Sequence, residues 1–197
     1  MQYTWLGHST FLIINDAGGR LVTDPADERT SPNQPHVTAD VITVSHRHFD
    51  HCATERVGGD PVVKESCEPE TLASFSIRGF HAFHDEVKGA KRGTNTIFLI
   101  EADGERFVHC GDLGHMPDEE TIAAIKGCDV LLIPVGGIFT VDGSTAWAIA
   151  KRVAPKTVVP MHFQTPDLGF TLEPVTNFLA AAKADPAPIL IELPSRD

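Results

Sequence analysis

Basic residues are scarce in this chain. Its 197 residues include 16 lysines and arginines against 27 aspartates and glutamates, and the formal net charge is −11. Nucleic acids and anionic membrane surfaces are bound by basic surfaces, so this balance argues against both kinds of partner. No apolar run approaches the roughly 18 residues of a transmembrane helix, so we expect no segment that spans a membrane.

Paired cysteine motifs are also missing. The four cysteines are scattered, with no Cys-x-x-Cys pair, at Cys52, Cys67, Cys110 and Cys128. The N-terminal residues lack the basic and then apolar layout of a signal peptide. In a chain without an export signal, free thiols are a better interpretation than disulfides, and we expect a cytoplasmic protein.

What the sequence does contain is an ordinary globular composition, with 42% hydrophobic and 22% charged residues. A chain of this length can bury a substantial core, and no linker rich in Pro, Gly or Ser divides it. We therefore predict a single domain over residues 1–197. A small-molecule substrate is the partner that fits best, and self-association is left open.

Short apolar runs bounded by turn residues predict strands at 3–6, 11–14, 20–23, 41–44, 61–64, 76–80, 94–100, 106–109, 130–134 and 157–161. Helices are predicted at 118–126, at 145–153 with Ser144 as its cap, and at 173–184. The first half is rich in strands and the second alternates strand with helix. Two sheets covered by helices would accommodate both halves, and this is an α/β fold.

The most informative segment is residues 45–51, Ser-His-Arg-His-Phe-Asp-His. Imidazole and carboxylate groups are ligands of zinc, iron and manganese. Alternate residues of an extended segment point the same way, so His46 and His48 can bind one ion. Asp50 and His51 lie further along and would face a second ion. The alternative is a solvated His-rich loop, but such loops rarely carry an interleaved Asp at this spacing.

Polar or glycine-rich residues follow five of the predicted strands. They are His46 after 41–44, His84 after 76–80, Asp112 after 106–109, Gly136 and Gly137 after 130–134, and His162 after 157–161. Because α/β folds place ligands at the ends of their strands, we expect these distant residues to converge.

Together these features resemble the metallo-β-lactamase superfamily. The matching segments are Gly7-His8-Ser9-Thr10, Thr23-Asp24-Pro25, residues 45–51, His84-Asp85, Cys110-Gly111-Asp112 and Pro160-Met161-His162. The compact branch related to the L-ascorbate-6-phosphate lactonases looks most similar. The resemblance implies a four-layer αββα sandwich with the site along one edge of the paired sheets.

The resemblance also implies a ligand set for two divalent ions, most simply zinc, with manganese or iron as alternatives. His46, His48 and His84 would bind the first ion, and Asp50, His51 and His162 the second. Asp112 would bridge the two, and a bridging hydroxide would attack an ester, lactone or phosphodiester. His81 competes with His84 for its position, and we prefer His84 because Asp85 and the following glycines place it in a loop. Asp50 could in addition orient the water.

Other candidate residues keep two interpretations. Asp24 either orients a ligating histidine or forms an Asp-Pro turn. His8 either lines the site and shuttles a proton or is a turn residue. Gly136 and Gly137 form a tight turn or bring backbone close to substrate. We expect His109 to be structural and Cys52 to be a packed thiol.

Two rivals to the hydrolase remain. The same fold can hold two irons and carry out oxygen or thiol chemistry, and ligand identity alone does not distinguish the metals. A metal-loaded binding module without turnover is the third interpretation.

Overall fold

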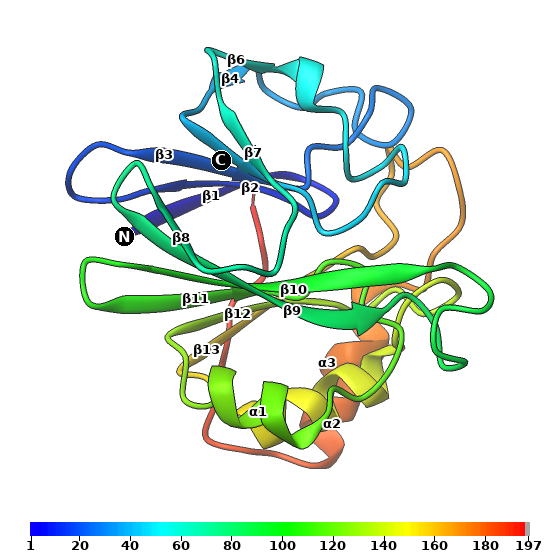
Figure 1. Cartoon of the computed structure of the whole chain (residues 1–197). Helices are drawn as coiled ribbons and strands as arrows, with labels where there is room; N and C mark the ends of the chain where they lie inside the picture. Colours follow the sequence, from blue (N-terminus) through cyan, green and yellow to red (C-terminus); the bar gives the residue numbers. More distant parts are fainter. Residues whose placement is uncertain (196–197) are drawn as a thin grey trace.

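Two β-sheets packed face to face form the centre of the fold in the computed structural model, which describes residues 1–195 (Figure 1). The five-stranded sheet contains β1 (Gln2–Gly7), β2 (Thr10–Ile14), β3 (Arg20–Thr23), β5 (Val41–Thr43) and β7 (Val62–Lys64), in that order. The pairs β1–β2 and β2–β3 are antiparallel, whereas β3, β5 and β7 run parallel.

The second sheet has seven strands in the order β14-β13-β12-β11-β10-β9-β8. They are β8 (Glu70–Leu72), β9 (Phe75–Phe83), β10 (Thr94–Ala102), β11 (Glu105–His109), β12 (Val130–Pro134), β13 (Thr157–Met161) and β14 (Leu190–Ile191). Strands β11 to β14 are parallel, and β10 pairs antiparallel with both β9 and β11. The carboxyl ends of β9, β11, β12 and β13 therefore lie at the same edge of this sheet.

Helices cover only one outer face of the sandwich. α1 (Glu119–Ile125), α2 (Gly143–Val153) and α3 (Val175–Ala184) pack below the seven-stranded sheet in Figure 1. The five-stranded sheet is covered by the two-stranded sheet β4 (Val37–Thr38) and β6 (Val57–Gly58) and by the 3-10 turn η1 (Thr54–Arg56). The layers follow the predicted sandwich order, with this fourth layer reduced to a short turn and two short strands.

Strand β12 shows why the seven-stranded sheet is buried on both sides. Leu131 and Ile133 pack against the helices, while Val130 and Leu132 pack against the other sheet. Successive side chains of a strand point to opposite faces, so an unbroken apolar run fits a strand covered twice. Phe98 of β10 is fully buried between the two sheets.

Aspartate side chains begin the first two helices. The carboxylate of Asp118 accepts the N–H of Thr121 at 2.8 Å, and that of Asp142 accepts the N–H of Thr145 at 2.7 Å. The prediction of Ser144 as a cap is therefore wrong: α2 begins at Gly143, so Asp142 is its N-cap and Ser144 lies within the first turn. All four cysteines are free thiols, as predicted.

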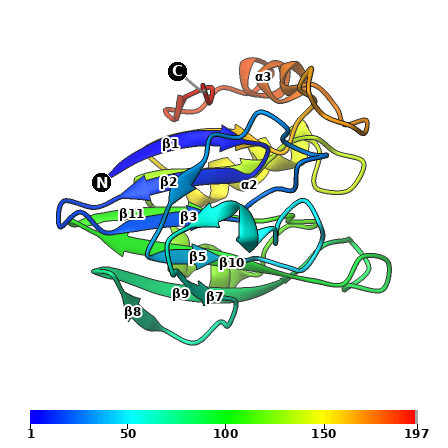
Figure 2. The same ribbon diagram turned by 90° about the horizontal axis from the view of Figure 1, so that it is seen from above.

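The loops after β5, β9, β12 and β13 gather at one end of the sandwich, on the right in Figure 1 and again in the view from above (Figure 2). Residues 45–51 lie at this end. The topology therefore brings together the strand ends that the sequence predicted to converge. No helix within residues 1–195 is both long enough and apolar enough to cross a membrane.

Candidate metal centre

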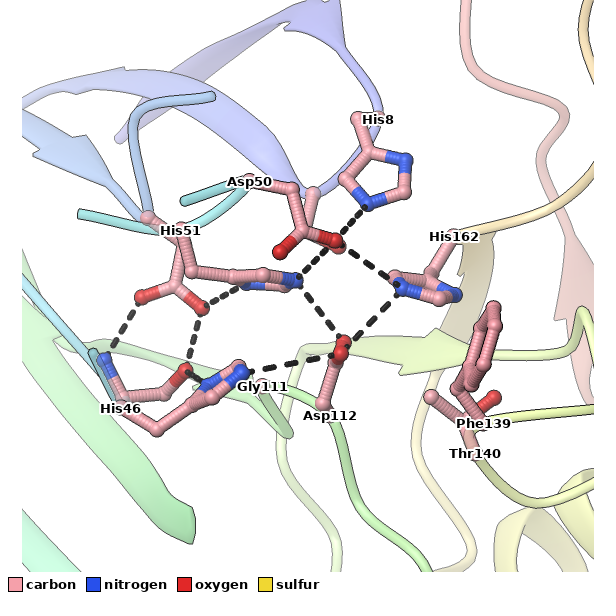
Figure 3. Close-up of polar contacts among 12 residues, drawn as sticks. His8, His46, Asp50, His51, Gly111, Asp112, Phe139, Thr140 and His162 are labelled. Carbon is pink, nitrogen blue, oxygen red and sulfur yellow. Dashed lines mark hydrogen bonds and ion pairs between the residues drawn. The ribbon is translucent and has the colours of Figure 1, made fainter. Parts of the chain in front are cut away.

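Asp112 stands at the centre of the histidine cluster (Figure 3). Its Oδ1 lies 3.0 Å from Nε2 of His51. Its Oδ2 lies 3.1 Å from Nε2 of His84, 3.2 Å from Nε2 of His162 and 3.7 Å from Nε2 of His46. One carboxylate thus lies beside imidazoles from the loops after β5, β9 and β13. This is the convergence that was predicted from the polar residues at the strand ends.

Two sets of potential ligand atoms lie beside this carboxylate. The first set is His46, His48 and His84, whose nitrogen atoms lie within 4.8 Å of one another. Their rings meet with centroids 4.6 to 5.0 Å apart. Three imidazoles in one place are a typical donor set for zinc.

The second set combines Asp50, His51 and His162, and it also includes His8. Nε2 of His8 lies 3.3 Å from Oδ2 of Asp50, and its ring centroid lies 4.2 Å from that of His162. Figure 3 shows the His8 ring turned inward from the β1–β2 turn. Of the two interpretations of His8, the structure favours a role at the site over a surface turn residue.

Several of these ring nitrogens have no hydrogen-bond partner. Within the described residues, the buried atoms without one include Nε2 of His46, His51 and His162 and Oδ1 of Asp112. A buried polar atom left without a partner costs roughly 1–3 kcal/mol. Bound cations would satisfy all of these lone pairs at once, so the residues present fit a metal site.

Asp24 holds two members of the cluster from behind. One carboxylate oxygen accepts the N–H of Ser45 at 2.7 Å, and the other accepts the Ser45 hydroxyl and Nδ1–H of His51, the latter at 2.8 Å. The Ser45 hydroxyl also lies 3.0 Å from Nδ1 of His46. A carboxylate on Nδ1 fixes the tautomer that leaves Nε2 free for a metal. The structure thus matches the interpretation of Asp24 as an orienting residue.

His84 is oriented by backbone rather than by a carboxylate. Its Nδ1 lies 3.1 Å from the carbonyl oxygen of Phe139. The next residue, Asp85, accepts the backbone N–H groups of Val87, Gly89, Lys91 and Arg92 at 2.8 to 2.9 Å. Burial would raise the pKa of Asp85, but these four N–H groups lower it to about 2. The Asp85 carboxylate therefore fixes the path of the loop after β9.

Charge coupling in the cluster is strong. Burial opposes charge on each group, yet the His162 and His51 imidazoles hold the pKa of Asp112 well below its usual range. In return, and again against burial, the Asp112 carboxylate raises the pKa of His162 to about 9 and that of His51 well above 6.5. A cation that binds here would therefore compete with protons for the same ring nitrogens.

Close backbone packing positions the ligand loops. A Cβ on Gly136 would lie 2.2 Å from the carbonyl oxygen of His162, and one on Gly111 would lie 2.5 Å from Cβ of Ser45. Gly136 therefore supports His162 from behind. Gly137 has φ +57° in the turn that places the Phe139 carbonyl beside His84. His162 and Asp24 also adopt positive φ, a strained conformation typical of functional sites.

Replacement of Gly136 by alanine is expected to destabilise the protein by about 1–3 kcal/mol, because the methyl group must push the His162 backbone away. Metal affinity should fall with it. Denaturant unfolding and a metal titration check both effects. Gly104→Ala is the control: it adds left-handed strain in open space at a distant hairpin. Equal effects of the two substitutions would contradict the supporting role of Gly136.

Other histidines lie outside the cluster. His81 is exposed on β9, where its ring packs 4.9 Å from that of Phe83, so His84 and not His81 faces Asp112. Nε2 of His109 donates to the carbonyl oxygen of Ser9 at 2.9 Å, and its Nδ1 accepts the N–H of Gly111. His109 is structural, as predicted. Cys52 is half-buried beside the motif.

A cavity of about 370 Å³ opens above the cluster. Its lining residues are His48, Phe49, Asp50, His84, Arg92, Asp112, Phe139, His162 and Phe170. The three phenylalanines and Arg92 were not predicted from the sequence. The one signal in the sequence is at Phe49, an apolar residue within the polar segment 45–51. In the structure its side chain is 49% exposed.

The chain is similar to known proteins in sequence and in fold. The sequence pattern of the beta-lactamase superfamily domain matches residues 2–162. A Methanoculleus marisnigri protein named as a metal-dependent hydrolase is 33% identical, over 84% of this chain and 82% of its own. One of the same name from Carboxydothermus hydrogenoformans is 29% identical, with 84% and 85% covered. A Thermotoga maritima crystal structure of the metallo-β-lactamase superfamily superposes with a TM-score of 0.78, at 31% identity and 98% coverage of both chains.

Proposed function

Because the chain belongs to the metallo-β-lactamase superfamily, we propose that it is a metal-dependent hydrolase that opens an ester, lactone or phosphodiester bond in a small molecule. The observation that carries this proposal is the Asp112 carboxylate, 3.0 to 3.7 Å from Nε2 of four imidazoles. The names of its relatives support the reaction class. The narrower relationship to L-ascorbate-6-phosphate lactonases stays a prediction.

In this proposal His46, His48 and His84 hold one divalent ion, and Asp50, His51 and His162 hold another, with Asp112 shared between them. Zinc is the first choice for such donors, and manganese or iron are the alternatives. When bound, such ions lower the pKa of a coordinated water toward neutrality and polarise the oxygen of the electrophile.

The protein's own groups prepare this chemistry. Asp24 and the Phe139 carbonyl fix the tautomers of His51 and His84, so that both present Nε2 to the centre. His8 donates to Asp50 and holds that carboxylate at the cavity wall. There Asp50 can orient a water and accept its proton. A cavity of about 370 Å³ suits a small molecule, and the acidic chain disfavours nucleic acid.

The direct test is turnover of a panel of lactones, carboxylic esters, thioesters and phosphodiesters by protein loaded with zinc, manganese or iron. We expect one of the bond classes to be cleaved only after metal loading. Full metal loading with no turnover anywhere in the panel would favour a binding module instead.

The identity of the native metal distinguishes the proposed hydrolase from a redox protein. We expect protein purified with its own metal to be colourless and to contain zinc or manganese. Elemental analysis and a visible absorption spectrum make this measurement. A coloured, redox-active di-iron protein would replace the hydrolase by the oxygen or thiol chemistry considered above.

Metal affinity should rise with pH. Burial lowers the pKa of His162, but the Asp112 carboxylate outweighs this and raises it from 6.5 to about 9. The stabilisation that this gives to the folded, metal-free protein is therefore complete below about pH 6.5 and is lost as pH rises through about 9. A metal must displace that proton, and each displaced proton costs about tenfold in apparent affinity per pH unit. Chelator competition between about pH 6 and pH 9 should show this rise. An affinity independent of pH would contradict the assignment of His162.

A further inference from the structure

Three phenylalanines surround the mouth of the cavity, and we name Phe49, Phe139 and Phe170 the aromatic collar. They come from three loops, those after β5, β12 and β13. The Phe170 ring centroid lies 6.3 Å from that of Phe49 and 6.1 Å from that of Phe139, and both pairs meet edge to face. The collar encloses a space directly above Asp50 and Asp112.

The collar is unusual in its exposure. Among the large hydrophobic side chains that are exposed within residues 1–195, Phe49 at 49% and Phe139 at 39% are the only aromatic ones. Exposed aromatic surface is unfavourable in a free protein, and apolar walls beside a few polar groups are the usual composition of a ligand site. The collar therefore indicates that the ligand carries a flat apolar group.

Arg92 supplies the one Lys or Arg side chain on the cavity wall in the described part of the chain. Its backbone N–H is held by Asp85, its Nη2 donates to the Ile138 carbonyl at 3.0 Å, and its guanidinium lies 5.7 Å from the Phe139 ring centroid. It forms no ion pair with a carboxylate of residues 1–195, whereas the neighbouring Lys91 is paired with Glu86. Its remaining donors are available to an anion.

We propose, building on the hydrolase function above, that the substrate is a small ester or lactone with an aromatic or similarly flat group and a separate anionic group. The collar receives the flat group, Arg92 binds the anion, and the scissile bond lies at the Asp112 cluster. Hydrolysis adds water across the acyl C–O bond: the hydroxyl joins the carbonyl carbon, the C–O bond breaks, and the proton passes to the departing oxygen. No redox partner is required.

The test compares two phenyl acetates of similar shape on the zinc-loaded protein. One carries a para sulfonate, an anion that binds zinc weakly, and the other a neutral para methylsulfonyl group. The ratio of their kcat/KM values is measured for the wild type, R92Q and K91Q. We expect the anion preference to fall at least about tenfold in R92Q, since hydrogen bonds to charged groups contribute at least that factor, and to be unchanged in K91Q. Phe170→Ala should lower both kcat/KM values together.

An anion preference that is equal in R92Q and the wild type would overturn the role of Arg92. Binding provides a readout that does not require turnover: calorimetric titration of the zinc-loaded protein with benzenesulfonate and with methyl phenyl sulfone. We expect R92Q to lose at least about tenfold in affinity for the sulfonate alone. Absence of turnover with this binding pattern intact would remove the proposed hydrolase function and leave the ligand class standing. Equal binding by R92Q and the wild type would remove the ligand class itself.

Discussion

Replacement of Asp112 by alanine is expected to abolish metal binding at the whole cluster and to reduce turnover by more than about 100-fold. Residues that merely orient metal ligands contribute 10- to 100-fold in affinity, and Asp112 contacts four of the imidazoles directly. Removal of the carboxylate also takes away the negative charge that lies 3.0 Å from Nε2 of His51 and 3.2 Å from Nε2 of His162. Elemental analysis and the activity panel measure the two losses.

Asp118→Asn is the control for this variant. It changes a carboxylate that caps α1, away from the cluster, and should cost about 1 kcal/mol of stability or less while the metal content stays that of the wild type. Asp112→Ala protein that keeps the metal content and the turnover of the wild type would show that the centre is organised by other residues.

The second large effect is expected at Asp24. Asp24 accepts three hydrogen bonds, one of them from Nδ1–H of His51. The Asp24→Asn substitution removes the negative charge beside that N–H and replaces one accepting oxygen by a donating NH₂ group. We expect a loss of about 10- to 100-fold in metal affinity, and activity restored in part by excess metal. Metal titration followed by turnover at saturating metal makes the measurement.

Asp27→Asn is the matched substitution for Asp24→Asn. Asp27 lies three residues away and accepts from Thr30 and Arg29 without contacting a histidine. If both variants weakened metal binding equally, the effect of Asp24 would belong to the loop and not to its contact with His51.

The sequence was most informative where several potential metal ligands lie close together along the chain. Residues 45–51 carry four potential metal ligands, and the strands before His84, Asp112 and His162 were recognisable from their apolar runs. Convergence then followed from topology, because the carboxyl ends of like-directed strands share an edge. His84 was preferred over His81 because Asp85 and the following glycines predicted a loop there. The structure adds that β9 pairs with β10 as far as Phe83, which leaves His81 within the strand.

The substrate side of the site could not be predicted in this way. Phe139, Phe170 and Arg92 lie in loops without a periodic pattern, and their directions depend on contacts with distant residues. The inward turn of His8 depends on Asp50, which is 42 residues away. The reduced outer layer of β4, β6 and η1 was also missed, because elements of two or three residues carry almost no pattern.

The loop that Asp85 holds in place affects how the substrate preference of this enzyme can change during evolution. One internal carboxylate ties down residues 87 to 92, so the segment keeps its path whatever side chains it displays outward. Mutations on its surface can then accumulate without moving His84 at its base. Substitutions in this loop can therefore change substrate preference during evolution while the metal-binding residues beneath it keep their positions.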